Sequence, residues 1–189
     1  GDDRYIDFNE STYSAYISTN EEYNTNILRY SYSSMLTPSS VYDYNMDTQE
    51  KKLLKQSEVI GKGYVQSLYD AETIYATARD GEKIPVYLVY RKDLKKDGPQ
   101  PLLLYSYGSY GSTSDPYFSS ARLSLLDRGI IYALTNVRGS QIFGRQSYED
   151  GKLLKKKNTF YDFIDAGKHL VEKKYTSPDQ LFCSGGSAG

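Results

Sequence analysis

The chain ends in Gly185-Gly186-Ser187-Ala188-Gly189, directly after a short apolar run at residues 181–183. This Gly-x-Ser-x-Gly pattern is typical of a nucleophile elbow, a sharp strand-to-helix turn that raises a serine hydroxyl above a sheet. Such a turn crowds the backbone on both sides of its apex, so the residues around the serine must be small. The simpler interpretation is a flexible glycine-serine tail. The preceding sequence distinguishes the two.

The residues before the motif predict a helix, a loop and a strand, which is the order that an elbow requires. Apolar side chains in residues 158–174 recur at the three- and four-residue spacing of an amphipathic helix. Thr159 and Asp162 resemble a capping box at its start, and Pro178 marks its end. Residues 181–183 are apolar and bounded by turn residues, as in a buried strand. The apolar helix positions are Phe160, Phe163, Ile164, Leu170 and Val171.

Composition limits the partners and the compartment. The 189 residues carry a formal charge of -1, which indicates no general attraction to nucleic acid or to an anionic membrane. No apolar stretch approaches the ~20 residues that span a bilayer. Cys183 is the single cysteine, so we expect no disulfide framework and an inert thiol packed in the buried strand. A cytoplasmic location fits this cysteine usage. The start lacks Met and an apolar signal region, so we expect a chain already cut at its front.

The first third of the chain has the alternation of β-strands. Polar and aromatic residues alternate in residues 27–33 and 42–47, and a return strand is expected near residues 52–55. Three or four short antiparallel strands fit one blade of a propeller, although a fragment of a sandwich would look much the same. We assign residues 1–60 to this all-β segment and residues 61–71, which begin Gly61-Lys62-Gly63, to a linker.

The remainder, residues 72–189, predicts an α/β domain. Strands are expected at 72–79 and 83–91, joined by a tight turn at Asp80-Gly81. A strand at 102–105, a helix at 118–128 closed by Gly129, and a strand at 130–135 come next. The helix and strand before the elbow complete the series. Strands that alternate with helices imply a parallel sheet with helices on its faces.

Four stretches carry a resemblance to a known family: PLLLYSYGSYG at 101–111, FSSARLSLLDRG at 118–129, YEDGKLLKKKNTF at 148–160, and the closing motif at 185–189. Together they resemble the prolyl oligopeptidase family of serine peptidases, and within it the oligopeptidase B group. The resemblance implies the N-terminal part of an α/β-hydrolase fold, truncated after the nucleophile. It also implies that the all-β segment is the last blade of a β-propeller.

The resemblance assigns roles to a few positions. Ser187 is expected to be the nucleophile, and the Tyr107 hydroxyl and the Ala188 backbone N–H are expected to form the oxyanion hole. Asp115 aligns with an acidic position that binds a basic substrate side chain beyond the primary pocket. Simple turn chemistry before a helix is the alternative for Asp115. Tyr117 stands where the family has a second acidic residue, which weakens that preference.

The rest of the catalytic machinery is expected outside these residues. In this fold the acid and the histidine follow the serine, whereas His169, the one histidine, precedes it. His169 lies opposite the apolar stripe, so we expect a solvated surface residue. The chain alone should therefore be inactive. It should also aggregate, because the strand at 181–183 becomes an exposed sheet edge.

These features predict a serine endopeptidase that hydrolyses short peptides after Arg or Lys through an acyl-enzyme, with no cofactor or metal. The alternatives are cleavage after proline, a lipase or esterase on the same fold, and a non-catalytic module that retains a hydrolase core. The residues that select the substrate are expected to follow Gly189.

Overall fold

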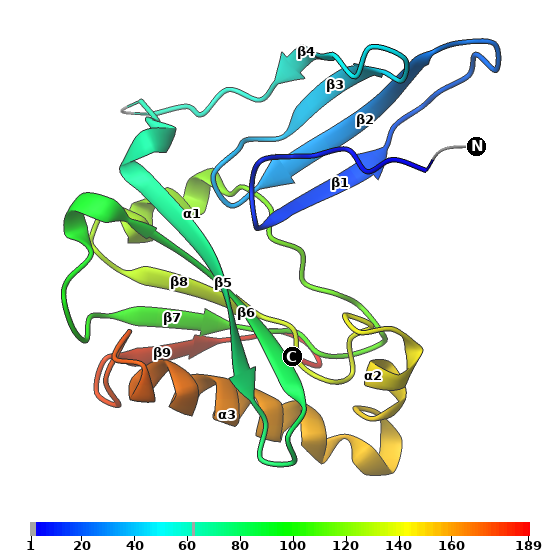
Figure 1. The fold of residues 1–189 in the computed structure, drawn as a ribbon. Coiled ribbons are helices and arrows are strands. Elements are labelled where there is room, and N and C mark those ends of the chain that lie inside the picture. Colours follow the sequence, from blue (N-terminus) through cyan, green and yellow to red (C-terminus); the bar gives the residue numbers. More distant parts are fainter. Residues whose placement is uncertain (1–2, 62) are drawn as a thin grey trace.

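The computed structural model describes residues 3–61 and 63–189, which form two separate sheets (Figure 1). The first sheet is antiparallel with the strands in sequence order, as expected for a propeller blade. One of its strands, β1, was not predicted. Lys62 of the predicted linker lies outside the described residues. The strands are β1 (Tyr13–Ile17), β2 (Ile27–Ser34), β3 (Ser40–Asn45) and β4 (Lys51–Gln56).

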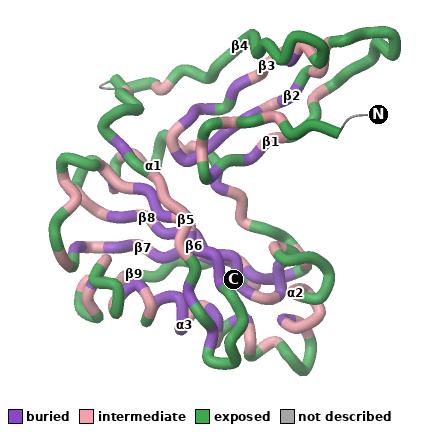
Figure 2. The backbone as a smooth tube through the Cα atoms, viewed as in Figure 1, coloured by how far each residue is buried: buried purple, intermediate pink, exposed green. Residues whose placement is uncertain are grey.

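Aromatic packing forms the core of the blade. Tyr30, Tyr32 and Tyr44 are buried, and the Phe8 ring stacks on Tyr32 with centroids 5.3 Å apart. Every residue of β4 is exposed, and Figure 2 shows that outer edge of the blade in green. The described residues therefore leave the β4 edge uncovered.

The second sheet combines a hairpin with parallel strands, as the sequence predicts. Its order is β5-β6-β8-β7-β9, with β6 antiparallel to its neighbours β5 and β8, and β7 parallel to its neighbours β8 and β9. The strands are β5 (Tyr69–Thr77), β6 (Lys83–Arg91), β7 (Leu102–Tyr105), β8 (Ile131–Thr135) and β9 (Leu181–Ser184). The helices are α1 (Ser120–Leu126), α2 (Arg145–Glu149) and α3 (Lys157–Glu172), and short 3-10 turns lie at Gln66–Leu68, Lys92–Leu94 and Leu153–Lys155.

Helices cover the two faces of this sheet. Ala166 and Leu170 of α3 are fully buried with Leu102 and Leu104 on one face. Leu126 of α1 packs on the other face in a cluster that includes Met35, from the turn after β2. The blade therefore contributes to the core of the second sheet, while the arrangement agrees with the predicted α/β-hydrolase half.

Two apolar features of this region are less covered than the sequence suggests. The apolar stripe of α3 is only partly covered, since Phe160 and Ile164 remain 55% and 46% exposed. Cys183, expected to be a packed thiol, is exposed. Both have the same cause: β9 is the last strand in the sheet order, so no described strand lies beyond it to cover its outer side.

The start of α3 also differs from the predicted capping box. Lys156 occupies the N-cap position and its side chain makes no capping hydrogen bond. Thr159 and Asp162 lie inside the helix and are both buried. Their side chains bond to the loop after β8 instead, because that loop lies against the first turns of α3.

Candidate active site

The final five residues form a tight turn at the carboxyl end of β9. Ser187 is exposed and has φ 57°, in the left-handed region that costs a residue with a side chain ~1–2 kcal/mol. The Gly189 N–H donates to the Gly186 carbonyl at 2.8 Å. A Cβ on Gly185 would lie 2.8 Å from the carbonyl carbon of Gly189. That distance is too short for a side chain, so only glycine fits at this position. The chain thus reverses with the serine at the apex, as an elbow requires.

Parallel pairing brings Tyr107 to this turn. β7 and β9 pair with Tyr105 opposite Ser184, so both segments leave the sheet at the same edge. A Cβ on Gly189 would lie 2.8 Å from Tyr107 Cα and 3.0 Å from Tyr107 Cδ2. Tyr107 therefore packs directly against the elbow, 80 positions upstream of Ser187 in the sequence.

A cavity of about 310 Å³ lies between the elbow and α3. Tyr107, Ala188 and Gly189 line one side of it, and Phe160 and Phe163 line the other. Ser187 itself lies outside this lining, at the exposed apex. The cavity therefore places a mainly apolar space next to the predicted oxyanion donors.

Lys156 connects the loop after β7 to the elbow. Its Nζ donates to the Gly108 carbonyl at 2.7 Å and to Ser109 Oγ at 2.6 Å. Ser109 Oγ in turn donates to the Ala188 carbonyl at 3.2 Å. Burial lowers the pKa of the Lys156 ammonium. Neither Lys156 nor Ser109 was predicted as a site residue, and the lysine run at 155–157 gives no sign of which side chain turns inward.

Close glycine contacts hold the surrounding loops together. Gly139 has φ 100°, and a Cβ there would lie 2.2 Å from the Gly108 carbonyl oxygen. A Cβ on Gly151 would lie 2.0 Å from Gly139 N. Thr159 Oγ1 donates to the Arg138 carbonyl at 2.7 Å. The loops after β7 and β8 and the segment before α3 therefore touch through their backbones.

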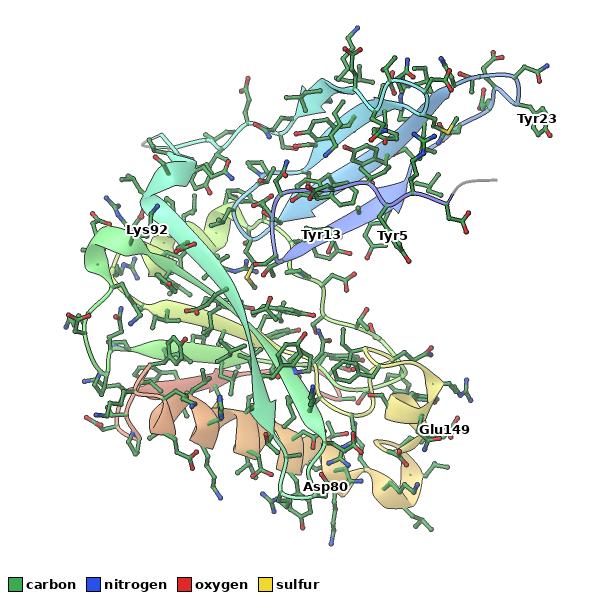
Figure 3. The ribbon with its side chains drawn as sticks, in the orientation of Figure 1. Tyr5, Tyr13, Tyr23, Asp80, Lys92 and Glu149 are labelled. Atoms are coloured by element: carbon green, nitrogen blue, oxygen red, sulfur yellow. The ribbon has the colours of Figure 1, made fainter. Side chains whose placement is uncertain are left out.

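A buried ion pair fixes the loop after β8. Asp162 accepts bonds from the Arg138 backbone N–H and Nε, each at 2.9 Å, and from Nη2 at 2.6 Å. Arg138 Nη1 also donates to Asp80 at 2.6 Å. Figure 3 places Asp80 at the turn of the β5–β6 hairpin. Bonding to Asp162 raises the pKa of Arg138, and bonding to Arg138 lowers the pKa of Asp80.

Asp115 lies away from the cavity, at a contact between the blade and the second sheet. Its Oδ2 accepts a hydrogen bond from Tyr16 of β1 and another from Tyr117 at 3.0 Å. The bond to Asp115 raises the pKa of Tyr16. Ser119 rather than Asp115 is the N-cap of α1. Capping therefore does not account for Asp115, and its role toward substrate remains a prediction.

The one histidine makes no contact with the elbow cavity. His169, predicted to be a solvated surface residue, lies on α3 and is half-buried, because α3 packs against the sheet. Burial, with a smaller effect of Lys173, lowers its pKa. Within residues 3–61 and 63–189, no acidic, histidine and cysteine side chains cluster as a metal site. No helix in these ranges has the length and apolar character to span a membrane.

Two family models match the chain. The model described as the prolyl oligopeptidase family matches residues 116–189, and the model of its N-terminal beta-propeller domain matches residues 1–57. The chain belongs to the prolyl oligopeptidase family. The two matches agree with the order observed here, in which the all-β sheet precedes the α/β part.

Individual members of the prolyl oligopeptidase family align along most of the chain. Dipeptidyl aminopeptidase BI of Pseudoxanthomonas mexicana is 51% identical over 100% of this chain and 26% of its own length. A prolyl endopeptidase of Elizabethkingia meningoseptica is 36% identical over 86% of this chain and 23% of its own. The structure of oligopeptidase B from Leishmania major superposes with a TM-score of 0.87 at 41% identity, covering 97% of this chain and 26% of that one. The chain spans about a quarter of the length of these relatives.

Proposed function

We propose that the protein containing this chain is a serine peptidase in which Ser187 is the nucleophile. The observation that carries the proposal is the elbow: an exposed serine at φ 57°, with Tyr107 packed against the glycine two residues later. Strain of this kind at a serine is typical of the turn that presents a nucleophile. Membership of the prolyl oligopeptidase family supports the same assignment.

The proposed reaction divides hydrolysis into two steps. Ser187 Oγ attacks the scissile carbonyl carbon and its proton passes to a histidine, which then protonates the leaving amine. The carbonyl oxygen, negative in the tetrahedral intermediate, accepts hydrogen bonds from the Tyr107 hydroxyl and the Ala188 N–H. Water then hydrolyses the acyl-enzyme. The histidine and its acid partner are expected outside this chain, since His169 is not in contact with the cavity.

For the substrate we propose short peptides cleaved after Arg or Lys. The likeness to oligopeptidase B at 41% identity supports this choice. Both hydrogen bonds found to Asp115 within the described residues reach Oδ2, which leaves Oδ1 as the atom that we propose binds a cationic substrate side chain. The prolyl endopeptidase at 36% identity keeps cleavage after proline as the first alternative. Dipeptidyl aminopeptidase BI, the relative at 51% identity, has release of dipeptides in its name, and this activity is the second alternative. A non-catalytic module is the third.

A fluorophosphonate probe on the full-length protein tests the nucleophile. We expect labelling of the wild type, loss of labelling in Ser187→Ala, and normal labelling in Ser124→Ala, which changes an exposed serine on α1. Equal labelling of all three would remove Ser187 as the nucleophile. No labelling and no peptidase activity in the wild type would favour the non-catalytic module.

Matched peptides separate the substrate classes. A blocked peptide with Arg before the scissile bond is expected to be cleaved, and its counterpart with Pro at that position is expected to be resistant. The opposite preference would support post-proline cleavage. A third peptide has a free amino terminus. If only this peptide is cleaved, and the cut falls after its second residue, the result would support dipeptide release.

A further inference from the structure

Lys156 occupies a position that is unfavourable for a lysine in three respects. It lies at the N-cap of α3, where the helix dipole disfavours a cation. It is half-buried, and burial lowers its pKa by disfavouring the charged form. None of the ion pairs found among residues 3–61 and 63–189 includes it. Helix stability therefore does not explain a lysine here, and its own contacts must.

Those contacts reach both halves of the predicted oxyanion site. The Gly108 carbonyl, which accepts from Lys156 at 2.7 Å, belongs to the residue next to Tyr107. Ser109 accepts from the same ammonium and donates to the Ala188 carbonyl. One ammonium thus fixes the loop that carries the phenol and, through one hydroxyl, the residue that carries the backbone N–H.

We propose that Lys156 is a positioning residue that holds the Tyr107 loop against the Ala188 turn, so that the two oxyanion donors converge. The proposal rests on the proposed peptidase function. Lys156 acts through Tyr107 and Ala188 and does not itself touch the reacting atoms. Donors that converge on a developing charge stabilise the transition state more than the bound substrate, so the contact acts mainly on kcat.

The test compares Lys156→Met with Lys157→Met in the full-length protein. Methionine keeps much of the length of lysine but removes its charge and donors, and Lys157 is the exposed neighbour. We expect Lys156→Met to lower kcat at least about tenfold with KM within twofold, because small displacements of catalytic groups cost large factors in rate. Lys157→Met should match the wild type. Equal kcat in the two variants would overturn the role of Lys156.

A double variant shows whether Lys156 acts through the phenol. Lys156→Met added to Tyr107→Phe should lower kcat further by less than about threefold, because the phenolic donor is already absent. A further loss as large as in the wild-type background would contradict the proposal.

Amide hydrogen exchange supplies a readout that needs no activity. Residues 106–111 should exchange faster in Lys156→Met than in Lys157→Met, and unchanged exchange would overturn the proposed contact. A wild type whose Ser187 resists the fluorophosphonate probe would overturn the peptidase and the role of Lys156 together. Normal labelling with no effect of Lys156→Met would overturn only the role of Lys156.

Discussion

Gly189 lies so close to the backbone of Tyr107 that there is no room for a side chain on residue 189. A Cβ on Gly189 would lie 2.8 Å from Tyr107 Cα and 3.0 Å from the Ser106 carbonyl oxygen. Backbone atoms cannot move aside as a flexible side chain can. The contact therefore ties the predicted nucleophile turn to the predicted oxyanion tyrosine.

Two glycines of the motif, Gly189 at its end and Gly186 before the serine, give a matched pair of variants. Gly189→Ala should lower kcat/KM about 100-fold or more, because the methyl group pushes the Tyr107 loop away from the elbow. Gly186→Ala should keep most of the activity, since a Cβ there meets nothing within 4 Å. Peptidase assays on the full-length variants check this. Similar losses in both would show that the close contact is not what the motif requires.

Asp115 gives a prediction about specificity. Asp115→Asn should raise KM about tenfold for a peptide with two adjacent basic residues and leave KM unchanged for a peptide with one, because only the second cation would meet this carboxylate. Tyr16→Phe removes the blade-side hydrogen bond but keeps the charge, so it serves as the control. If the two variants alter KM equally for both peptides, Asp115 acts only as a contact with the blade.

The contacts of Asp165 give a prediction about how stability depends on pH. It accepts bonds from the Arg79 backbone N–H at 2.9 Å, from Nε at 3.0 Å and from Nη2 at 2.9 Å, and these lower its pKa below the ordinary 3.8. The ionised carboxylate therefore stabilises the fold above that ordinary value, and the contribution is lost as the pH falls through the lowered pKa.

Asp165→Asn should accordingly cost about 1–2 kcal/mol at pH 7, a value reduced because water reaches Arg79. Thermal unfolding of the full-length protein, followed by circular dichroism, measures the gap in the free energy of unfolding between the variant and the wild type. The gap should be constant from pH 5 to 8 and narrow below about pH 4. Asp97→Asn in the exposed loop before β7 is the control. A gap that widens in acid would contradict the assignment.

The 189 residues expressed alone should aggregate. Ile164 on α3 and Phe182 on the edge strand β9 are 46% and 55% exposed, and an exposed apolar edge pairs with other chains. Ile164→Lys combined with Phe182→Lys should shift the material toward monomer in size-exclusion chromatography with light scattering. Tyr23→Lys, at a distant exposed site, should not. A monodisperse wild-type chain with a cooperative melt would refute this expectation.

Local pattern predicted most of the fold. Alternation and helical spacing located the hairpin, the parallel strands and α3, because these elements bury one face. Strand β1 was not predicted because it does not bury an apolar face: Ser14 is buried while Ile17 is 76% exposed. Helix α2 was missed because none of its residues is buried, so no apolar period marks it.

The site was predictable only where it is local in sequence. Steric demand within five residues made the elbow visible from its glycines. The contacts of Lys156 with Ser109 and of Arg138 with Asp162 join segments 47 and 24 residues apart, and sequence spacing carries no information about them. From the sequence, Asp162 was assigned to a helix cap. Only the packing of the loop after β8 shows that its partner is Arg138.

The in-register pairing of β7 with β9 has a consequence for how related sequences can diverge. With Tyr105 opposite Ser184, the phenol and the serine keep their relative height only if the two residues from 105 to 107 and the three from 184 to 187 are neither lengthened nor shortened. Substitutions in these short spans can be absorbed one at a time, but a single insertion or deletion would shift one group past the other. Length polymorphism should therefore be confined to loops such as 92–99.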